Sequence, residues 1–263
     1  MRVVGALERI GTRTIGSLEA LGRFVLLAGR VLRLVATGAV HGRNTFSQMA
    51  FIGVESLPIA LITALSIGMV FTLQISNEFI RFGATSVIGG VSAIALTREL
   101  IPTLTGVVIA GRVGAAIAAE LGSMKVTEQI DALTALASDP IYYLVVPRVI
   151  ACAVMLPLLT LVGDAVSIVG GYAVAVAVKG VPPQLFVNSL QDLVVSSDVL
   201  RGLVKAGIFG AVVGLIGCHQ GLSTTAGARG VGKATTDSVV LSLITIFVSN
   251  YFLSALLFPG AGK

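Results

Sequence analysis

Charged residues are scarce in this sequence. Asp, Glu, Lys and Arg supply 12% of its 263 residues, whereas a soluble domain of this length has about a quarter. Tryptophan is absent, apolar residues supply 55% of the chain, and glycine occurs 31 times. Low charge with many small residues is typical of helical membrane proteins, in which small side chains let helices approach closely. The composition therefore predicts an all-α, polytopic membrane protein.

Residues that bind metals are also few. Cys152 and Cys218 lie in apolar runs, and His41 and His219 have no partner at ligand spacing. We expect no metal site, and we interpret both cysteines as buried thiols. The net charge of +5 comes largely from arginines near the N-terminus. This distribution favours a membrane-topology signal over a nucleic-acid interface, so we expect no nucleic-acid partner.

Five stretches are long and apolar enough to cross a bilayer, which takes roughly 20 residues. They lie at about 55–78, 92–119, 149–178, 205–222 and 238–259. Outside them, Lys and Arg concentrate on the side that the N-terminus occupies. This bias predicts a cytoplasmic N-terminus and a C-terminus on the opposite side. A short surface helix is predicted in an outer loop at 185–200.

Residues 1–50 precede the apolar stretches and carry arginines at helical spacing. Arg2, Arg9 and Arg13 share one face, and leucines lie largely opposite. We interpret this region as an amphipathic helix at the inner membrane surface, and a soluble cap packed on the bundle is the alternative. Residues 51–263 then form the transmembrane domain.

A short amphipathic helix is predicted between the second and third stretches, at about 127–138. Thr127 is a candidate N-cap. Ile130 belongs to an apolar face, while Glu128 and Asp131 belong to an acidic one. The helix is either an interfacial connector or a docking helix that fits a groove on a soluble partner.

Some charged residues fall inside the predicted spans, where a charge is costly unless it is paired or faces water. Arg98 and Glu99 begin the second span near the outer side, where Arg98 either attracts a lipid phosphate or snorkels to the interface. We interpret Arg112 and Glu120, nearer the inner side, as a structural ion pair or helix tie. Asp164 lies mid-span, and proton coupling is the alternative that it raises.

Residues 227–235, GARGVGKAT, come close to a phosphate-binding loop. Ala234 stands where that motif needs Ser or Thr, and no sheet is predicted beside it. We interpret the segment as the inner loop between the fourth and fifth spans. Its glycines permit a tight turn, and Thr235, Thr236 or Asp237 is expected to cap the last helix.

Several short motifs follow one another along the chain. They are R-E-L-I-P-T-L-T-G at 98–106, A-G-R-x-G at 110–114, A-E-L-G-x-M at 119–124, E-Q-I-D-A-L at 128–133, D-P at 139–140, P-R at 147–148 and G-V-G-K-A-T-T-D-S-V-V at 230–240. In order and spacing, this set resembles the MlaE/YrbE family of ABC-transporter permeases, which has bacterial and chloroplast-envelope members. The resemblance covers nearly the whole chain after the N-terminal helix.

The resemblance implies a permease subunit that moves phospholipid or a related lipid between membranes of the cell envelope. It implies a homodimer, separate ABC ATPase subunits that use ATP and Mg, and an MCE-domain lipid-binding protein on the outer side. It implies no catalytic residue and no bound cofactor in this chain. The implied location is the bacterial inner (plasma) membrane, with the plastid inner envelope as the alternative.

Carried over residue by residue, the resemblance makes E-Q-I-D-A-L the coupling helix that receives the movement of the ATPase. The implied contacts are Glu128, Gln129, Asp131 and Leu133. Arg98 and Glu99 would be the charged pair beside the lipid cavity.

Two other classes of function are alternatives to the permease. An ion-coupled secondary transporter predicts inverted repeats, and the sequence has none that we detect. An intramembrane enzyme needs a nucleophile and a base on facing helices, and the sequence has no Gly-x-Ser-x-Gly elbow.

Overall fold

The computed structural model describes residues 2–38, 40–225 and 227–258, and these residues form helices joined by short turns. The α-helices are α1 (Arg2–Ala36), α2 (Gly42–Arg81), α3 (Ile88–Ala95), α4 (Ile101–Ile109), α5 (Ala115–Val126), α6 (Gln129–Ala135), α7 (Val146–Ala177), α8 (Pro183–Leu193), α9 (Ser196–Leu222) and α10 (Gly227–Leu257). A 3₁₀ turn covers Thr85–Val87, and π-helical turns cover Leu96–Leu100, Ala110–Gly114 and Ile141–Val145. The all-α prediction is confirmed for the part of the chain that is described.

Five helical segments are long and apolar enough to cross a membrane, as the sequence predicts. They are Gly42–Arg81, Thr85–Val126, Ile141–Ala177, Ser196–Leu222 and Gly227–Leu257. Each is longer than the predicted stretch because the helices continue through charged residues at their ends. The second segment joins α3, α4 and α5 into one rod, and its two π-helical turns interrupt the regular hydrogen bonding.

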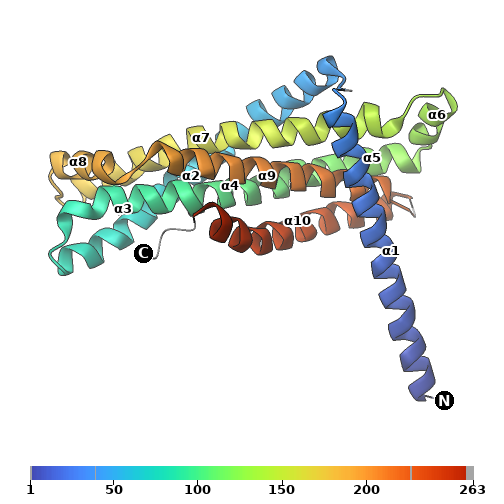
Figure 1. Cartoon of the computed structure of the whole chain (residues 1–263), viewed down its shortest axis with the longest axis horizontal. Coiled ribbons are helices and arrows are strands. Elements are labelled where there is room, and N and C mark those ends of the chain that lie inside the picture. The colour runs from blue at the N-terminus through green and yellow to red at the C-terminus, as the bar shows by residue number, and fades with distance from the viewer. Residues whose placement is uncertain (1, 39, 226, 259–263) are drawn as a thin grey trace.

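The five segments run side by side along the long axis of the molecule (Figure 1). Helix α1 crosses them at the end that also carries α6, whereas α8 lies at the opposite end (Figure 1). The prediction for the arginine face of α1 concerns Arg2, Arg9 and Arg13, whose side chains lie outside the described ones. Helix α8 occupies part of the predicted surface helix at 185–200, because residues from Ser196 onward already belong to α9.

Close packing between helices depends on glycine at several crossings. A methyl group added to Gly68 of α2 would overlap the backbone of Ser167 in α7. One added to Gly210 of α9 would overlap the backbone of Cys152, also in α7. Small residues allow this approach, and close backbone contact is a main source of helix association in a membrane. Helix α7 therefore forms the centre of the bundle, between α2 and α9.

The GARGVGKAT segment is helical, so the prediction of a loop at 227–235 is wrong. The turn lies before it, and α10 begins at Gly227. The hydroxyls of Thr235 and Thr236 donate to the carbonyl of Gly232 at 2.6 and 3.2 Å, within the helix, so neither residue caps it. Glycine lowers helix propensity but does not forbid a helix that packs against a neighbour, and Gly230 lies directly against the backbone of Thr225.

Candidate functional site

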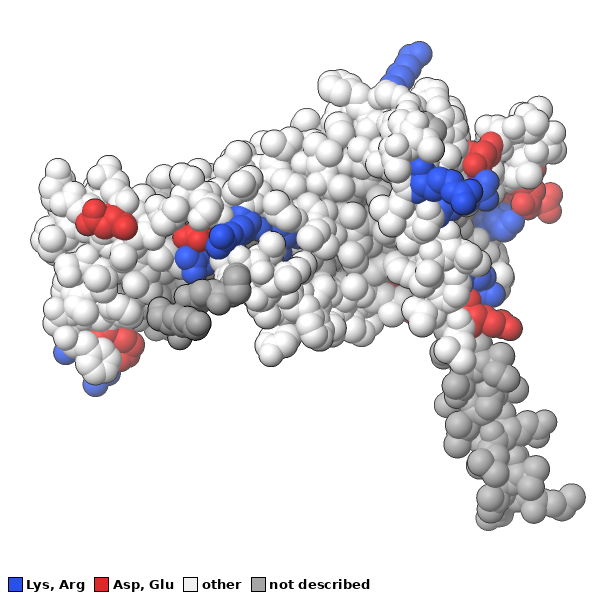
Figure 2. Space-filling model, viewed as in Figure 1, with Lys and Arg blue, Asp and Glu red and all other residues white. Residues whose placement is uncertain are grey.

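One candidate site lies where α9 passes the π-helical turn Leu96–Leu100. It contains Arg98, Glu99, Asp198, Arg201 and Lys205, which we call the charged cluster. Arg98 Nη2 lies 2.9 Å from Asp198 Oδ1, and Lys205 Nζ lies 2.7 Å from Glu99 Oε2. Figure 2 shows charged side chains at both ends of the molecule and in one patch between them, within an otherwise uncharged face. Arg98 and Glu99 do not pair with each other, because Arg98 pairs with Asp198 and Glu99 pairs with Lys205, both on α9.

The ammonium group of Lys205 is completely buried and donates to two groups besides Glu99. It donates to Ser254 Oγ at 2.8 Å and to the carbonyl oxygen of Arg98 at 3.3 Å. The amide of Asn250 donates to Glu99 Oε2 at 3.2 Å, so the same carboxylate accepts from two helices. A buried ion pair is tolerated when such hydrogen bonds satisfy its remaining donors and acceptors. The network ties α9 and α10 to the second span.

The arginines of the cluster keep donors for another group. Arg98 and Arg201 both lie over the ring of Phe258, with Cζ 5.1 and 5.9 Å from the ring centroid. Among the described residues Arg201 has no acidic partner, and Arg98 Nε has no hydrogen-bond acceptor. Three basic and two acidic side chains leave the cluster with one net positive charge. An anionic group with several oxygens matches these planar, multi-donor side chains.

The second candidate site is α6, at the end of the bundle opposite α8 (Figure 1). Ile130 is buried and Leu133 packs against the main core, so the apolar face of α6 is turned inward. Glu128, Gln129 and Asp131 are exposed and point their polar groups outward. The structure thus exposes the acidic face of this helix and covers its apolar face.

Strained backbone lies at both ends of α6. Glu128 has φ of 60° and Ala137 has φ of 56°, in the left-handed region that residues with a side chain rarely adopt. Helix α6 begins after Glu128, and Thr127 belongs to the end of α5, where its hydroxyl donates to the carbonyl of Ser123 at 2.8 Å. Thr127 is therefore not the predicted N-cap. Such strain persists where the surrounding structure fixes it, often at functional sites.

Ionic and polar contacts fix α6 and the turn that follows it. Lys125 Nζ of α5 lies 2.9 Å from Asp131 Oδ1, and the side-chain amide of Gln129 donates to Thr127 Oγ1 at 3.0 Å. After α6, Asp139 accepts from the backbone N–H of Ile141 at 3.0 Å. These contacts connect α6 to α5 and order the turn that leads into the third span.

The predicted tie between Arg112 and Glu120 takes another form. Arg112 Nη2 lies 2.7 Å from Glu55 Oε2, and Arg112 Nη1 donates to Ser56 Oγ at 2.7 Å. Glu120 Oε1 lies 2.7 Å from Nη2 of the buried Arg148. The two residues are not paired with each other, because they point to different neighbours. Arg112 joins the second span to α2, and Glu120 joins it to α7.

Asp164 is the acidic residue in the middle of α7. Its side chain is buried, and neither carboxylate oxygen has a partner among the described residues. Ser167 Oγ donates to the backbone carbonyl of Asp164 rather than to its side chain, at 2.8 Å. Ionising an isolated carboxyl in such a place is costly, so we expect the neutral acid.

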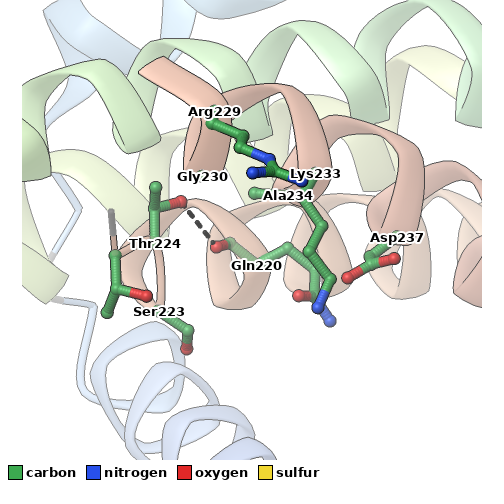
Figure 3. A pocket seen from close by; sticks show the side chains of 9 residues that line it. Gln220, Ser223, Thr224, Arg229, Gly230, Lys233, Ala234 and Asp237 are labelled. Atoms are coloured by element: carbon green, nitrogen blue, oxygen red, sulfur yellow. Dashed lines mark hydrogen bonds between the residues drawn. The ribbon is translucent and has the colours of Figure 1, made fainter. Parts of the chain in front are cut away.

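A cavity of about 550 Å³ lies between the end of α9 and the start of α10 (Figure 3). Its lining includes Gln220, Thr224, Arg229, Lys233 and Asp237. Thr224 Oγ1 donates to the carbonyl of Gln220 at 3.1 Å, as drawn in Figure 3. A phosphate-binding loop holds its anion with free backbone N–H groups that precede a helix, whereas here the glycine-rich segment is itself helical. The geometry is not that of a nucleotide-binding loop.

Comparison with known proteins identifies the family of this chain. The sequence model of a family described as Permease MlaE matches residues 45–256. The chain belongs to the MlaE permease family. A probable ABC transporter permease protein of Synechocystis sp. is 53% identical over 236 residues, which are 90% of each chain. The protein TRIGALACTOSYLDIACYLGLYCEROL 1, chloroplastic, of Arabidopsis thaliana is 43% identical over 237 residues, which are 90% of this chain and 68% of that protein.

A third relative is a probable ABC transporter permease protein of Rickettsia bellii, 42% identical over 249 residues that cover 95% of this chain and 96% of that protein. This MlaE-family chain is therefore a multi-pass membrane protein of the ABC-transporter permease kind. The family match begins at residue 45, just inside α2, so α1 lies before it.

Sequence reasoning missed three of the five residues of the charged cluster in this MlaE-family permease, namely Asp198, Arg201 and Lys205. It assigned Arg201 and Lys205 to an outer loop and its edge, and it gave no role to Asp198. A signal was present, because residues 198, 201 and 205 recur at helical spacing and therefore share one face. The start of α9 at Ser196 brings all three onto the side that faces Arg98 and Glu99.

Proposed function

We propose that this MlaE-family permease is the membrane subunit of an ABC transporter that moves phospholipid or a related lipid between membranes of the cell envelope. A separate ATPase drives it, so the chain needs neither a catalytic residue nor a cofactor of its own. The observation that carries the proposal is the charged cluster, because it places arginine donors on an otherwise uncharged face of the bundle. The name of the Arabidopsis relative includes the word trigalactosyldiacylglycerol, which is a galactolipid, and this supports a lipid substrate.

At the outer half of the bundle, Arg98 and Arg201 would receive the lipid headgroup. Asp198 orients Arg98, and the ring of Phe258 supports both guanidinium groups. A phosphate or another anionic headgroup would then bind the donors that the cluster leaves open. Glu99 and Lys205 would hold the surrounding helices in place, since their charges already neutralise each other at 2.7 Å.

At the inner end, α6 would receive the movement of the ATPase through Glu128, Gln129 and Asp131. Leu133 would act differently, by holding α6 against the core. The force would pass into α5, because Lys125 ties α5 to Asp131 at 2.9 Å. From there the rod of α5, α4 and α3 reaches the charged cluster, and its π-helical turns are places where a rod can bend.

We further propose the assembly that the family resemblance implies. Two permease copies would enclose the lipid cavity, and an MCE-domain protein would meet the outer end, where α8 lies. The exposed apolar face of α10, which includes Ile244, Phe247 and Tyr251, would contact lipid or the second copy. The N-terminus would lie in the cytoplasm of a bacterial cell, with the plastid inner envelope as the alternative location.

A charge-reversal experiment tests the inner end of this proposal. Glu128→Lys combined with Asp131→Lys should weaken co-purification of the ATPase subunit while leaving membrane insertion intact, because it reverses the outward acidic face of α6. Asp192→Lys is the matched control, since Asp192 is exposed on α8 at the opposite end. Equal ATPase recovery with the double variant and the control would contradict the docking role of α6.

A further inference from the structure

A groove lies between α1 and the inner end of the bundle. Its α1 wall contains Arg23, Leu26 and Arg30, and its bundle wall contains Ile141, His219 and Leu222. We call it the α1 groove, and its volume is about 300 Å³. Two adjoining cavities of about 500 and 630 Å³ also include Arg30 in their lining. Arg30 is thus the residue common to all three spaces.

The walls of the groove are held in place by contacts on both sides. Leu27 and Val31 of α1 are buried in the main core. The ring of Phe24 meets the ring of His219 edge-on, with centroids 5.5 Å apart. Arg30 Nη2 lies 2.9 Å from Asp139 Oδ2. The groove is consequently a fixed surface and not a gap beside a loosely attached helix.

The chemistry of the groove is divided between basic donors and exposed apolar surface. Arg23 and Arg30 keep most of their side-chain surface exposed, at 64% and 56%. The acidic groups that face them are Glu19, at 4.0 Å from Arg23, and Asp139. Each contact uses one part of a guanidinium group that has five donors. Leu26 lies between the two arginines in sequence and is 75% exposed.

The position of the groove adds a further constraint. Helix α1 crosses the spans at the end where α6 lies (Figure 1), and basic side chains gather on this end of the molecule (Figure 2). Arg33, which lines the adjoining cavity along α1, adds another cation on the same stretch of helix. Basic residues beside an exposed apolar surface at a membrane boundary match an anionic lipid headgroup and the first part of its acyl chain.

We propose that the α1 groove binds an anionic glycerophospholipid of the adjacent leaflet. Arg23 and Arg30 bind its phosphate, and Leu26 and Leu222 cover the upper methylene groups of an acyl chain. A small soluble anion would leave Leu26 bare, which is why the structure favours a lipid. The site lies at the end of the bundle that carries α6, away from the charged cluster, and does not depend on lipid being transported.

Photocrosslinking of the full-length chain in nanodiscs tests this site. The nanodiscs contain phosphatidylcholine with a small fraction of phosphatidylglycerol that carries a photoactivatable acyl chain. We expect labelled peptides from α1 around Leu26 and from the end of α9 around Leu222. Removing both charges with Arg23→Gln and Arg30→Gln should lower this labelling roughly fivefold for each arginine.

The control is Arg43→Gln, which removes an exposed cation at the start of α2, outside the groove. It should leave the labelling unchanged. Equal labelling by photoactivatable phosphatidylcholine, or complete displacement of the probe by millimolar inorganic phosphate, would overturn the proposal of an anionic lipid. Unchanged labelling in the double variant would overturn it as well.

A second variant keeps the test decisive if the double variant does not insert into membranes. Leu26→Asn removes apolar surface from an exposed position without changing any charge, so the fold should tolerate it. Labelling should fall severalfold, because the acyl chain loses its apolar wall. Labelling equal to that of the unmodified chain would contradict the binding geometry.

Discussion

The ion pair between Glu99 and Lys205 yields a quantitative prediction. Lys205 is 0% exposed, and its ammonium lies 2.7 Å from a Glu99 carboxylate that is 39% exposed. Breaking a fully buried pair by removing one partner costs about 3–5 kcal/mol. Glu99→Gln leaves this ammonium without its counter-charge, but the glutamine oxygen can still accept from it. We therefore expect the free energy of unfolding to fall by about 2–3 kcal/mol, near the low end of that range.

Lys205→Met should cost less than Glu99→Gln, because the remaining carboxylate is partly exposed and still accepts from Asn250. Combining the two changes removes both charges. The double variant should therefore be more stable than the sum of the single costs predicts, with a coupling of about 1–2 kcal/mol. This coupling, rather than either single value, measures the ion pair.

The two cysteines allow unfolding to be measured by thiol labelling. Cys152 and Cys218 are both completely buried, so a thiol reagent labels them only when the bundle opens. Labelling of the purified protein in detergent, measured against increasing denaturant, should shift to lower denaturant concentration in Glu99→Gln. Strictly additive costs, or a Glu99→Gln protein as stable as the unmodified chain, would refute the reasoning.

Three further predictions concern the proposed lipid site, the buried acid and helix packing. Arg98→Ala should reduce the amount of phospholipid recovered with the purified complex, as measured by mass spectrometry. Equal recovery would contradict the proposed binding of the lipid headgroup by Arg98. Asp164→Asn should retain ATP-driven lipid movement, because the buried acid is expected to be neutral; loss of a proton-dependent component would support the secondary-transporter alternative. Gly68→Ala should destabilise the bundle in the cysteine-labelling assay because the added methyl overlaps the Ser167 backbone, whereas Gly111→Ala, which meets no atom within 4 Å, should not.

Much of the fold could be predicted from the sequence because hydropathy determines which segments cross a membrane. The number of spans follows from uncharged runs, and the short helices α6 and α8 follow from their amphipathic patterns. The ends of the spans could not be found in this way. Helices continue through charged residues where a partner or water is within reach, as α9 does through Asp198.

The candidate site was only partly predictable, because pairing depends on which helices become neighbours. Arg98 and Glu99 are adjacent in sequence, yet adjacent residues on a helix point in different directions. The structure sends each of them to α9. For the same reason Arg112 and Glu120 bind different helices. The glycine-rich segment at 227–235 is predicted from the sequence to be a loop because glycine has low helix propensity. In the structure it is helical because packing of α10 against α9 outweighs that propensity.

The central claim is that a separate ATPase drives lipid movement through this chain, and reconstitution tests it most directly. The permease would be placed in liposomes that contain a labelled phospholipid, with or without the proposed ATPase and MCE-domain partners, and lipid transfer would be measured. The account predicts transfer that requires ATP and the ATPase and that falls in the Arg98→Ala variant. Transfer by the permease alone, driven by a proton gradient without ATP, would contradict it.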